Sequence, residues 1–421
     1  MDQKEPIDLF LFTYNCGKSP VGSDNFVSKL TKSLPPQLSS LYVFGVEELC
    51  DIIDGTSFKV SNRHFLRLNQ AILDALNTKY GEEGTVFHTL SMVHIGAIGL
   101  IVLSPYPSLF SDIHATKTAC GYFYSSLKGA VGIRLNYKKS VELTFANAHL
   151  SAYEGEFYYQ RRNQQVISLM RALDFNDGFG FLKPNSHSFF MGDLNYRTVK
   201  SIKEKSVITE LASLQDQSLS LSNPIEELVQ KYDELSEAIR KDEVFMGFTE
   251  GCINFPPTYK FHVGTGIYNV KRSPSWCDRI LYQSTYNMKT NGQEEPYPRI
   301  NQYNSLKTLL TSDHLPVFLS ITIPFDAPEP IIADNGYLKI LPNDQVIDHF
   351  HRDKSVFADN ASGPTQIYMK PTKVDRIVNY IVTPTVDSIM GNTLWFTTTS
   401  NGRLVLLLFF LIVGSGLIFW Y

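Results

Sequence analysis

Polar side chains suited to hydrolytic chemistry stand at the ends of short, β-rich apolar runs in this sequence. Asn15, Glu48 and His149 each lie at or just beyond the end of such a run. Asp193 and Asn195 follow another run two positions apart, so on extended backbone both side chains point to one side. Carboxylate and amide oxygens are ligands that hold Mg²⁺, and histidines carry charge and protons near neutral pH. The repetition predicts strands that deliver these groups to one rim.

Two stacked layers of strands are needed to position these groups. The runs are too apolar for a sheet with one wet face, which favours two packed sheets with helices outside them. The predicted strands are 7–13, 41–46, 141–145, 188–191, 278–283 and 316–323. Helical periodicity is clearest in 65–80, 164–173 and 225–240.

Six motifs, taken in order, resemble the inositol polyphosphate 5-phosphatase family within the wider DNase I-like phosphoesterases. They are TYN (13–15), GVEE (45–48), FANAHL (145–150), GDLNYR (192–197), PSWCDR (274–279) and SDHLPV (312–317). A lone GDLN or SDH segment is ordinarily a turn or a helix cap, but the ordered combination is specific. The resemblance covers residues 6–324 and implies an α/β fold, a four-layer α/β/β/α sandwich.

The resemblance also implies roles in hydrolysing a phosphate monoester, which requires charge neutralisation, an aimed water and a stabilised leaving group. Glu48 is expected to be the principal Mg²⁺ ligand, with Asn15 beside it. Asp193 and Asn195 are expected to position and activate the attacking water. No covalent intermediate is implied.

Two histidines match the positions that face the phosphate in the family, His149 and His314. Asp278 matches the carboxylate that orients His314, and such a pair favours the charged imidazole. Asp313 is expected either to take part directly or to support its neighbours.

Substrate contacts are implied by PTYKF (257–261) and KRSPSWCDR (271–279). Tyr259, Lys260 and Arg272 match residues that contact the phosphate next to the one cleaved. Lys128 matches a lysine on the substrate side, with a solvated turn lysine as the alternative.

Two departures from the family pattern, and one matching pair, bear on these roles. Glu47 stands where glutamine is usual, and its charge either alters metal affinity or faces away. Val270 occupies a position that is basic in many relatives. Arg161 and Arg162 match the family, yet either touch the site or form salt bridges at a helix start.

Composition excludes several other functions. Net charge is −4, so no broad basic field exists to bind nucleic acid. The five cysteines are irregularly spaced, with no zinc-binding pair, and suit a reducing compartment. None has an arginine six residues later, which argues against a cysteine phosphatase.

The C-terminal part of the chain changes character. Residues 1–325 are predicted to be the catalytic domain, 326–403 a linker, and 404–421 a transmembrane anchor in which only Ser415 is strongly polar. Such a helix rises roughly 27 Å, which matches the thin endoplasmic-reticulum membrane. Because the run reaches the last residue, insertion is expected after synthesis, which leaves the catalytic domain cytosolic.

The sequence therefore predicts Mg²⁺-dependent removal of the 5-phosphate from phosphatidylinositol 4,5-bisphosphate, which yields phosphatidylinositol 4-phosphate. The alternatives are a sphingomyelinase-like or other phosphodiesterase of the same fold, and a membrane adaptor without activity. Intact catalytic positions argue against the adaptor.

Overall fold

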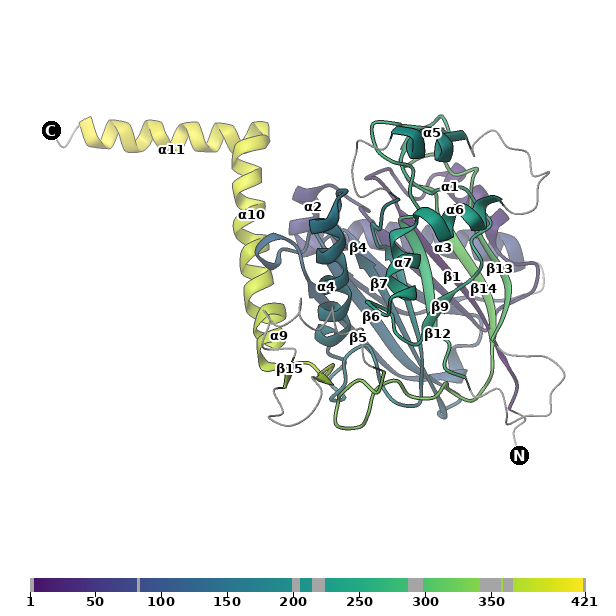
Figure 1. Ribbon diagram of the computed structural model, residues 1–421. Coiled ribbons are helices and arrows are strands. Elements are labelled where there is room, and N and C mark those ends of the chain that lie inside the picture. Colours follow the sequence, from purple (N-terminus) through teal and green to yellow (C-terminus); the bar gives the residue numbers. More distant parts are fainter. Residues whose placement is uncertain are drawn as a thin grey trace.

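Two six-stranded sheets stacked face to face form the centre of the protein, with helices on both outer sides (Figure 1). The computed structural model describes residues 4–81, 84–198, 205–213, 224–286, 298–340, 357–358 and 366–418. The layers follow the predicted α/β/β/α order.

The first sheet contains the strands that end at Asn15 and Glu47. In sheet order its strands are β13 (Arg299–Ser305), β14 (Val317–Ile323), β1 (Ile7–Asn15), β2 (Leu41–Glu47), β4 (Ile98–Ser104) and β3 (His88–Ile95). The pair β1–β2 is parallel and the other pairs are antiparallel.

The second sheet has the same plan. In sheet order its strands are β5 (Phe110–Ala119), β6 (Gly129–Tyr137), β7 (Val141–His149), β8 (Ser186–Asp193), β12 (Asp278–Gln283) and β9 (Phe248–Glu250). The pair β7–β8 is parallel, so His149 and Asp193 are register partners at its carboxyl end. A hydrogen bond from Asn15 to Asp193 joins this rim to the end of β1.

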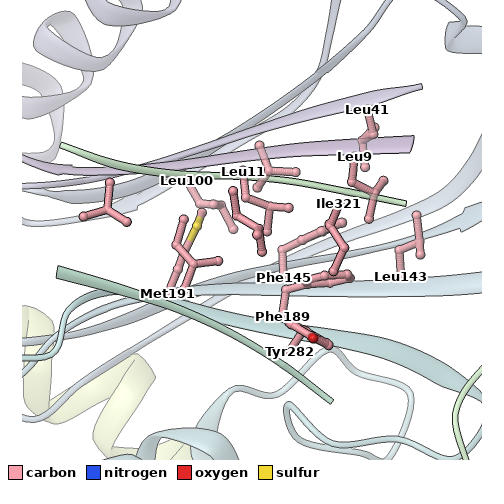
Figure 2. Packing of buried hydrophobic residues seen from close by; sticks show 14 of the residues in the cluster. Leu9, Leu11, Leu41, Leu100, Leu143, Phe145, Phe189, Met191, Tyr282 and Ile321 are labelled. Carbon is pink, nitrogen blue, oxygen red and sulfur yellow. The ribbon is translucent and has the colours of Figure 1, made fainter. Parts of the chain in front are cut away.

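The core between the sheets is built from alternate residues of each strand. In β1, Leu9 and Leu11 face the second sheet, whereas Phe10 and Phe12 face the outer helices. Figure 2 shows Leu9 and Leu11 opposite Phe145 and Met191 across the space between the sheets. Both faces of the central strands are buried, which explains why these runs are almost wholly apolar.

Helices cover each sheet on its outer side. Those packed on the first sheet are α1 (Asp24–Ser33) and α3 (Phe58–Tyr80), and those on the second are α4 (Glu156–Ala172) and α7 (Glu234–Arg240). The shorter elements are α2 (Ile52–Thr56), η2 (Pro107–Leu109), η3 (Tyr122–Tyr124), α5 (Lys205–Ser213), α6 (Pro224–Tyr232), and the hairpin β10 (Phe261–His262) and β11 (Ile267–Tyr268).

The helix predicted at 225–240 is two helices, α6 and α7. The break falls at Asp233, whose carboxylate accepts hydrogen bonds from the Ser236 backbone N–H (2.8 Å) and hydroxyl (2.7 Å) and so caps α7. The same carboxylate pairs with Arg279 at 2.7 Å. The helical spacing of apolar residues continues through Asp233, so the sequence pattern does not reveal that the helix breaks there.

The described parts of 326–403 do not form a loose linker but pack on the catalytic body. The remaining elements are β15 (Phe357–Ala358), β16 (Gln366–Ile367), α9 (Lys373–Ile377), the π-helical turn η4 (Val378–Val382), α10 (Thr383–Thr398) and α11 (Ser400–Ile418). Ile331, Ile332, Leu338, Ile367 and Met369 join the core beneath α4. The predicted domain boundary at 325 leaves these core residues outside. The sequence does not indicate that this segment joins the core, because its apolar residues are scattered among polar ones.

Within the described residues, no single helix is both long enough and apolar enough to cross a membrane. The pair Lys373–Thr398 and Ser400–Leu411 meets that test jointly, with a bend of 87° between its members (Figure 1).

Candidate active site

Asp193 lies at the centre of a cluster of buried polar groups where the ends of β1, β7 and β8 meet. Its Oδ2 accepts a hydrogen bond from Asn15 Nδ2 at 2.8 Å and lies 3.1 Å from His149 Nε2. Its Oδ1 accepts the backbone N–H of Asn195 at 3.1 Å. Burial alone would raise the pKa of Asp193, but His314 and His149 outweigh it and hold that pKa far below its usual value. The carboxylate is therefore a fixed negative charge.

A second carboxylate orients His314. Asp278, at the start of β12, has its two oxygens 3.2 and 3.0 Å from His314 Nδ1, and the Thr258 hydroxyl donates to Oδ2 at 2.6 Å. Burial lowers the pKa of His314, but Asp278 and Asp193 raise it to about 9 overall. The two carboxylates thus favour the charged imidazole of His314, whose Nε2 lies 3.9 Å from Asp193 Oδ2.

His149 has a different environment because Lys128 lies against it. Lys128 Nζ contacts His149 Nε2. Burial lowers the pKa of His149, and the neighbouring ammonium lowers it further. The two histidines therefore differ, with His314 held as a cation and His149 favoured as the neutral ring.

Glu48 directly follows β2 and faces the same site. Its backbone has a φ of +46°, a left-handed conformation that is rare outside glycine and asparagine. Its charge acts on Lys128, His149 and Lys260, which places it among them. Within the described chain its carboxylate has no hydrogen-bond donor, so its oxygens are available to a cation.

Glu47 points the other way, into the protein. It is fully buried, and Oε1 accepts a hydrogen bond from the Thr13 hydroxyl at 3.1 Å. Its Oε2 is buried without a partner in the described chain. Burial, with Asp193 and Asp278 nearby, raises the pKa of Glu47 well above its usual value. The extra carboxyl is therefore held inside the protein, in surroundings that disfavour its ionised form.

Two groups of residues could hold a metal ion. Ligand atoms of Asp193, Asp278 and His314 all lie within 4.8 Å of one another. These atoms, however, are engaged in ion pairs with one another, and His314 is charged. Glu48, whose carboxylate accepts no hydrogen bond within the described chain, fits a hard cation better, whereas the side-chain oxygen of Asn15 already accepts the Gly17 N–H at 3.0 Å.

Substrate-side residues gather at the other edge of the cluster. Lys260 Nζ pairs with Asp313 Oδ2 at 2.6 Å, and this carboxylate raises the pKa of Lys260 although its partial burial opposes the shift. The Tyr259 ring lies 4.6 Å from the His314 ring. Arg272 lies over Tyr153 at 5.8 Å, beside the loop after β7. Asp313 thus supports Lys260, as one of its two expected roles requires.

Arg197 is a site residue that the sequence analysis left without a role. It is buried, and its guanidinium lies 4.4 Å from the centre of the Tyr259 ring. It donates a hydrogen bond to the Asn195 side-chain oxygen, while Asn195 Nδ2 donates to the Leu150 carbonyl at 3.1 Å. Asn195 therefore fixes the turn around Asp193. In the sequence, the one indication that Arg197 belongs to the site is that it ends the GDLNYR motif at 192–197.

The arginine pair after Tyr159 lies mostly outside the cluster. Arg162 is buried and pairs with Glu234 at 2.6 Å, which is a structural contact. Arg161 donates to the Ser151 hydroxyl at 3.1 Å and stacks on Tyr122 at 5.0 Å.

Comparison with known proteins agrees with this geometry. The model of endonuclease/exonuclease/phosphatase family 2 matches residues 12–320. The chain belongs to the endonuclease/exonuclease/phosphatase family. Among curated members, phosphatidylinositol 3,4,5-trisphosphate 5-phosphatase 2 of Sus scrofa is 25% identical over 387 residues, 84% of this chain but 28% of that protein. Type IV inositol polyphosphate 5-phosphatase 11 of Arabidopsis thaliana is 30% identical over 203 residues, 47% of this chain and 53% of that one.

Solved structures of the same fold include a 5-phosphatase domain and a nitrophorin. The 5-phosphatase domain of SPsynaptojanin, solved with inositol (1,4)-bisphosphate and calcium ion, has a TM-score of 0.63 at 24% identity and covers 77% of this chain and 86% of that one. Cimex nitrophorin, in its ferrous NO complex, has a TM-score of 0.53 at 19% identity, covering 76% and 99%. The resemblance to inositol polyphosphate 5-phosphatases is thereby confirmed. The fold also occurs in nitrophorin, so function must be argued from the site.

Proposed function

We propose that the chain is a Mg²⁺-dependent phosphatase that removes the 5-phosphate of phosphatidylinositol 4,5-bisphosphate. The observation that carries the proposal is the arrangement around Asp193, in which an ionised carboxylate is held by Asn15 and His149 beside the charged His314–Asp278 pair. That arrangement suits an in-line attack of water on a phosphate monoester. The curated relatives named as 5-phosphatases support it.

The protein groups divide the chemistry. Asp193 is suited to orient the attacking water, because its ionised carboxylate lies at the centre of the cluster. His314, kept protonated by Asp278, stabilises the negative phosphoryl oxygens. Lys128 adds positive charge next to His149. When bound at Glu48 and Asn15, Mg²⁺ would neutralise charge on the phosphate.

Selection of a 4,5-bisphosphate rests on the cations at the opposite edge. Lys260, held by Asp313, and Arg272 are suited to bind the phosphate adjacent to the one cleaved. A phosphodiesterase such as a sphingomyelinase has no use for a second phosphate contact, which makes it the weaker candidate. An inactive adaptor would have no need of the charged pair beneath the site.

Phosphate release separates these candidates. We expect Mg²⁺-dependent release from phosphatidylinositol 4,5-bisphosphate, and none from sphingomyelin or DNA. Lys260→Ala should cost about 1.5–3 kcal/mol more in kcat/KM on the 4,5-bisphosphate than on the 5-monophosphate, since a charge-assisted contact is lost. Equal losses on both lipids would refute the role of Lys260, and diester cleavage would refute the proposed function.

We further propose that residues 404–421 anchor the chain in the endoplasmic-reticulum membrane, with the catalytic body in the cytosol. As a helix, the 18 residues 404–421 would rise about 27 Å, close to the roughly 27 Å core of that membrane. A fluorescent protein fused to residues 390–421 should label internal membranes and resist alkaline extraction. Diffuse fluorescence, or a catalytic domain protected from protease outside intact microsomes, would refute the anchor or its orientation.

A further inference from the structure

The helical segment Lys373–Thr398, made of α9, η4 and α10, turns polar residues towards the body. Asn379, Thr383, Asp387 and Gly391 recur every four residues and so share one face. Their contacts to the body are Thr118 Oγ1 to Asn379 Oδ1 (2.7 Å), Thr383 Oγ1 to the Tyr124 carbonyl (2.8 Å), and the Ser126 N–H to Asp387 Oδ1 (2.9 Å). At Gly391 an added Cβ would lie 2.3 Å from the Thr56 hydroxyl. The docked face is therefore polar and close-fitting.

The outward side of this segment carries large apolar side chains set among threonine, serine and asparagine. Ile377, Tyr380, Ile381 and Ile389 are 52%, 66%, 60% and 63% exposed. An ordinary surface helix has the opposite arrangement, with its apolar side on the protein. Two exposed cations, Lys373 and Arg376, stand at the start of the segment, and beyond them the single charged residue before Arg403 is Asp387 on the docked face.

Hydroxyl groups along the segment are satisfied by the helix itself. Four threonines of the segment donate to the carbonyl four residues earlier: Thr385 (2.7 Å), Thr393 (2.8 Å), Thr397 (2.7 Å) and Thr398 (2.6 Å). A threonine bonded in this way needs no water. Because these hydroxyls already donate within the helix, moving them out of water leaves no donor unsatisfied.

What covers this face follows from the next helix. In α11 the described apolar side chains from Leu404 to Leu411 are almost all exposed, and an exposed helix that is apolar on all sides belongs in a bilayer. The bend between the two helices is 87°. If α11 stands along the membrane normal, the segment before it must lie along the membrane surface (Figure 1).

We propose that the outward face of Lys373–Thr398 lies in the interface of the same bilayer that holds α11, so that the segment attaches the catalytic body flat to its own membrane. The proposal rests on the proposed anchor and goes beyond it. An anchor with a loose linker would let the body reach a second membrane. A docked segment confines it to lipids of the membrane in which it is inserted.

Fluorophore depth in vesicles tests the proposal. The full chain carries one fluorophore at Ile389→Cys, Leu408→Cys or Val86→Cys, with Cys120 and Cys252, which are not fully buried, replaced by serine. Each protein is reconstituted in phosphatidylcholine vesicles, and quenching by doxyl-labelled lipid is compared with quenching by iodide. Val86 is the control, since it is 62% exposed in the loop before β3.

We expect the fluorophore at position 389 to be quenched by doxyl lipid and to be several-fold less sensitive to iodide than that at 86. Sensitivity to iodide equal to that at 86 would overturn the proposal. If doxyl lipid quenches the fluorophore at position 408 but not that at 389, the result supports the membrane anchor and refutes the interfacial position of Lys373–Thr398. If neither is quenched, both fall. Protection of 389 from both quenchers would indicate a protein partner, such as a second copy, and would also overturn the proposal.

Turnover provides an independent measurement. The double variant Ile381→Asp with Ile389→Asp should lose several-fold activity on vesicle lipid while keeping its activity on soluble inositol 1,4,5-trisphosphate. Val86→Asp should change neither activity. An unchanged vesicle rate in the double variant would contradict the proposal. Absence of soluble turnover in the unmodified chain would refute the enzymatic function while leaving the depth result intact.

Discussion

Glu47 and Glu48 are adjacent, yet their backbone conformations send the two carboxyl groups to different surroundings. Glu47 is the last residue of β2 and points into the protein, where burial favours its neutral form. Glu48 takes a left-handed backbone conformation, which turns its carboxylate to the site. The same side chain is therefore an uncharged core group at one position and a candidate ligand at the next.

Substituting glutamine at each position separates these roles. Glu48→Gln should reduce kcat by about a thousandfold, because a metal ligand that balances phosphate charge is weakened. Mg²⁺ affinity, measured by calorimetry, should fall with it. Glu47→Gln should keep both activity and affinity.

The matched variant also makes a prediction about stability. The raised pKa of Glu47 means that the native state binds more protons than the unfolded state, so stability falls as pH rises above the unfolded value of 4.5. Glu47→Gln should therefore raise the denaturation midpoint at pH 8 more than at pH 4. A larger activity loss in Glu47→Gln than in Glu48→Gln would contradict both assignments.

The pair of His314 and Asp278 predicts the alkaline limb of the rate profile. Because Asp278 helps to raise the pKa of His314 to about 9, activity should fall as pH passes through that value. The charged histidine also stabilises the fold below pH 6.5, and that contribution is lost as pH rises through about 9. In Asp278→Asn the alkaline limb should move from about 9 towards 6.5. An unchanged limb would exclude His314 as the titrating group.

At the scale of elements, the strand ends were predictable and the docked segments were not. The runs that precede Asn15 and Asp193 are apolar on both faces, because both faces of their strands are buried. An apolar run of this kind can be recognised in the sequence. The break at Asp233 cannot, since a cap interrupts the helix without interrupting its apolar period. Nor can the ion pair that joins α9 to α4, between Asp375 and Arg171, because no local pattern encodes a contact between residues so far apart in sequence.

The contact between α4 and α9 offers a test at this scale. Arg171 donates to Asp375 through Nε (3.1 Å) and Nη2 (2.9 Å), and both side chains are buried. Asp375→Asn retains the oxygen that caps α9 but leaves the buried guanidinium without its counter-charge, which should cost about 3 kcal/mol. Hydrogen exchange in α9 and α10 should quicken in this variant.

The neighbouring Arg376 is the control. It pairs with Asp174 at 2.7 Å, but its side chain is 52% exposed. Arg376→Ala should therefore cost about 1 kcal/mol or less and leave exchange in α10 nearly unchanged. Similar effects of the two variants would mean that the buried pair does not hold the segment.

For the whole molecule, the catalytic body extends well beyond the last strand of its sheets. Ile331, Ile332, Leu338, Ile367 and Met369 close the core below α4, and α10 lies along the side of the body. Sequence alone placed the boundary at the end of the family resemblance, because the added segment does not carry the family motifs. The family motifs, and the family model that matches residues 12–320, end before the core does.

Truncation should reveal the true boundary. A chain ending at residue 398 should be soluble, well folded and active on soluble substrate. A chain ending at 330 removes five buried apolar side chains, worth about 1.5–3 kcal/mol each, and should be severely destabilised. Equal melting temperatures for the two chains would contradict the docked position of the segment.

The central claim is hydrolysis of one phosphate monoester at a defined ring position, and the identity of the product tests it most directly. The full chain, with Mg²⁺, is incubated with inositol 1,4,5-trisphosphate, and the product is resolved by chromatography against positional isomers, with Asp193→Asn as the control. We predict inositol 1,4-bisphosphate and an equal amount of inorganic phosphate from the unmodified chain, and neither product from the variant. Loss of the 4-phosphate, or equal turnover by Asp193→Asn, would contradict the account.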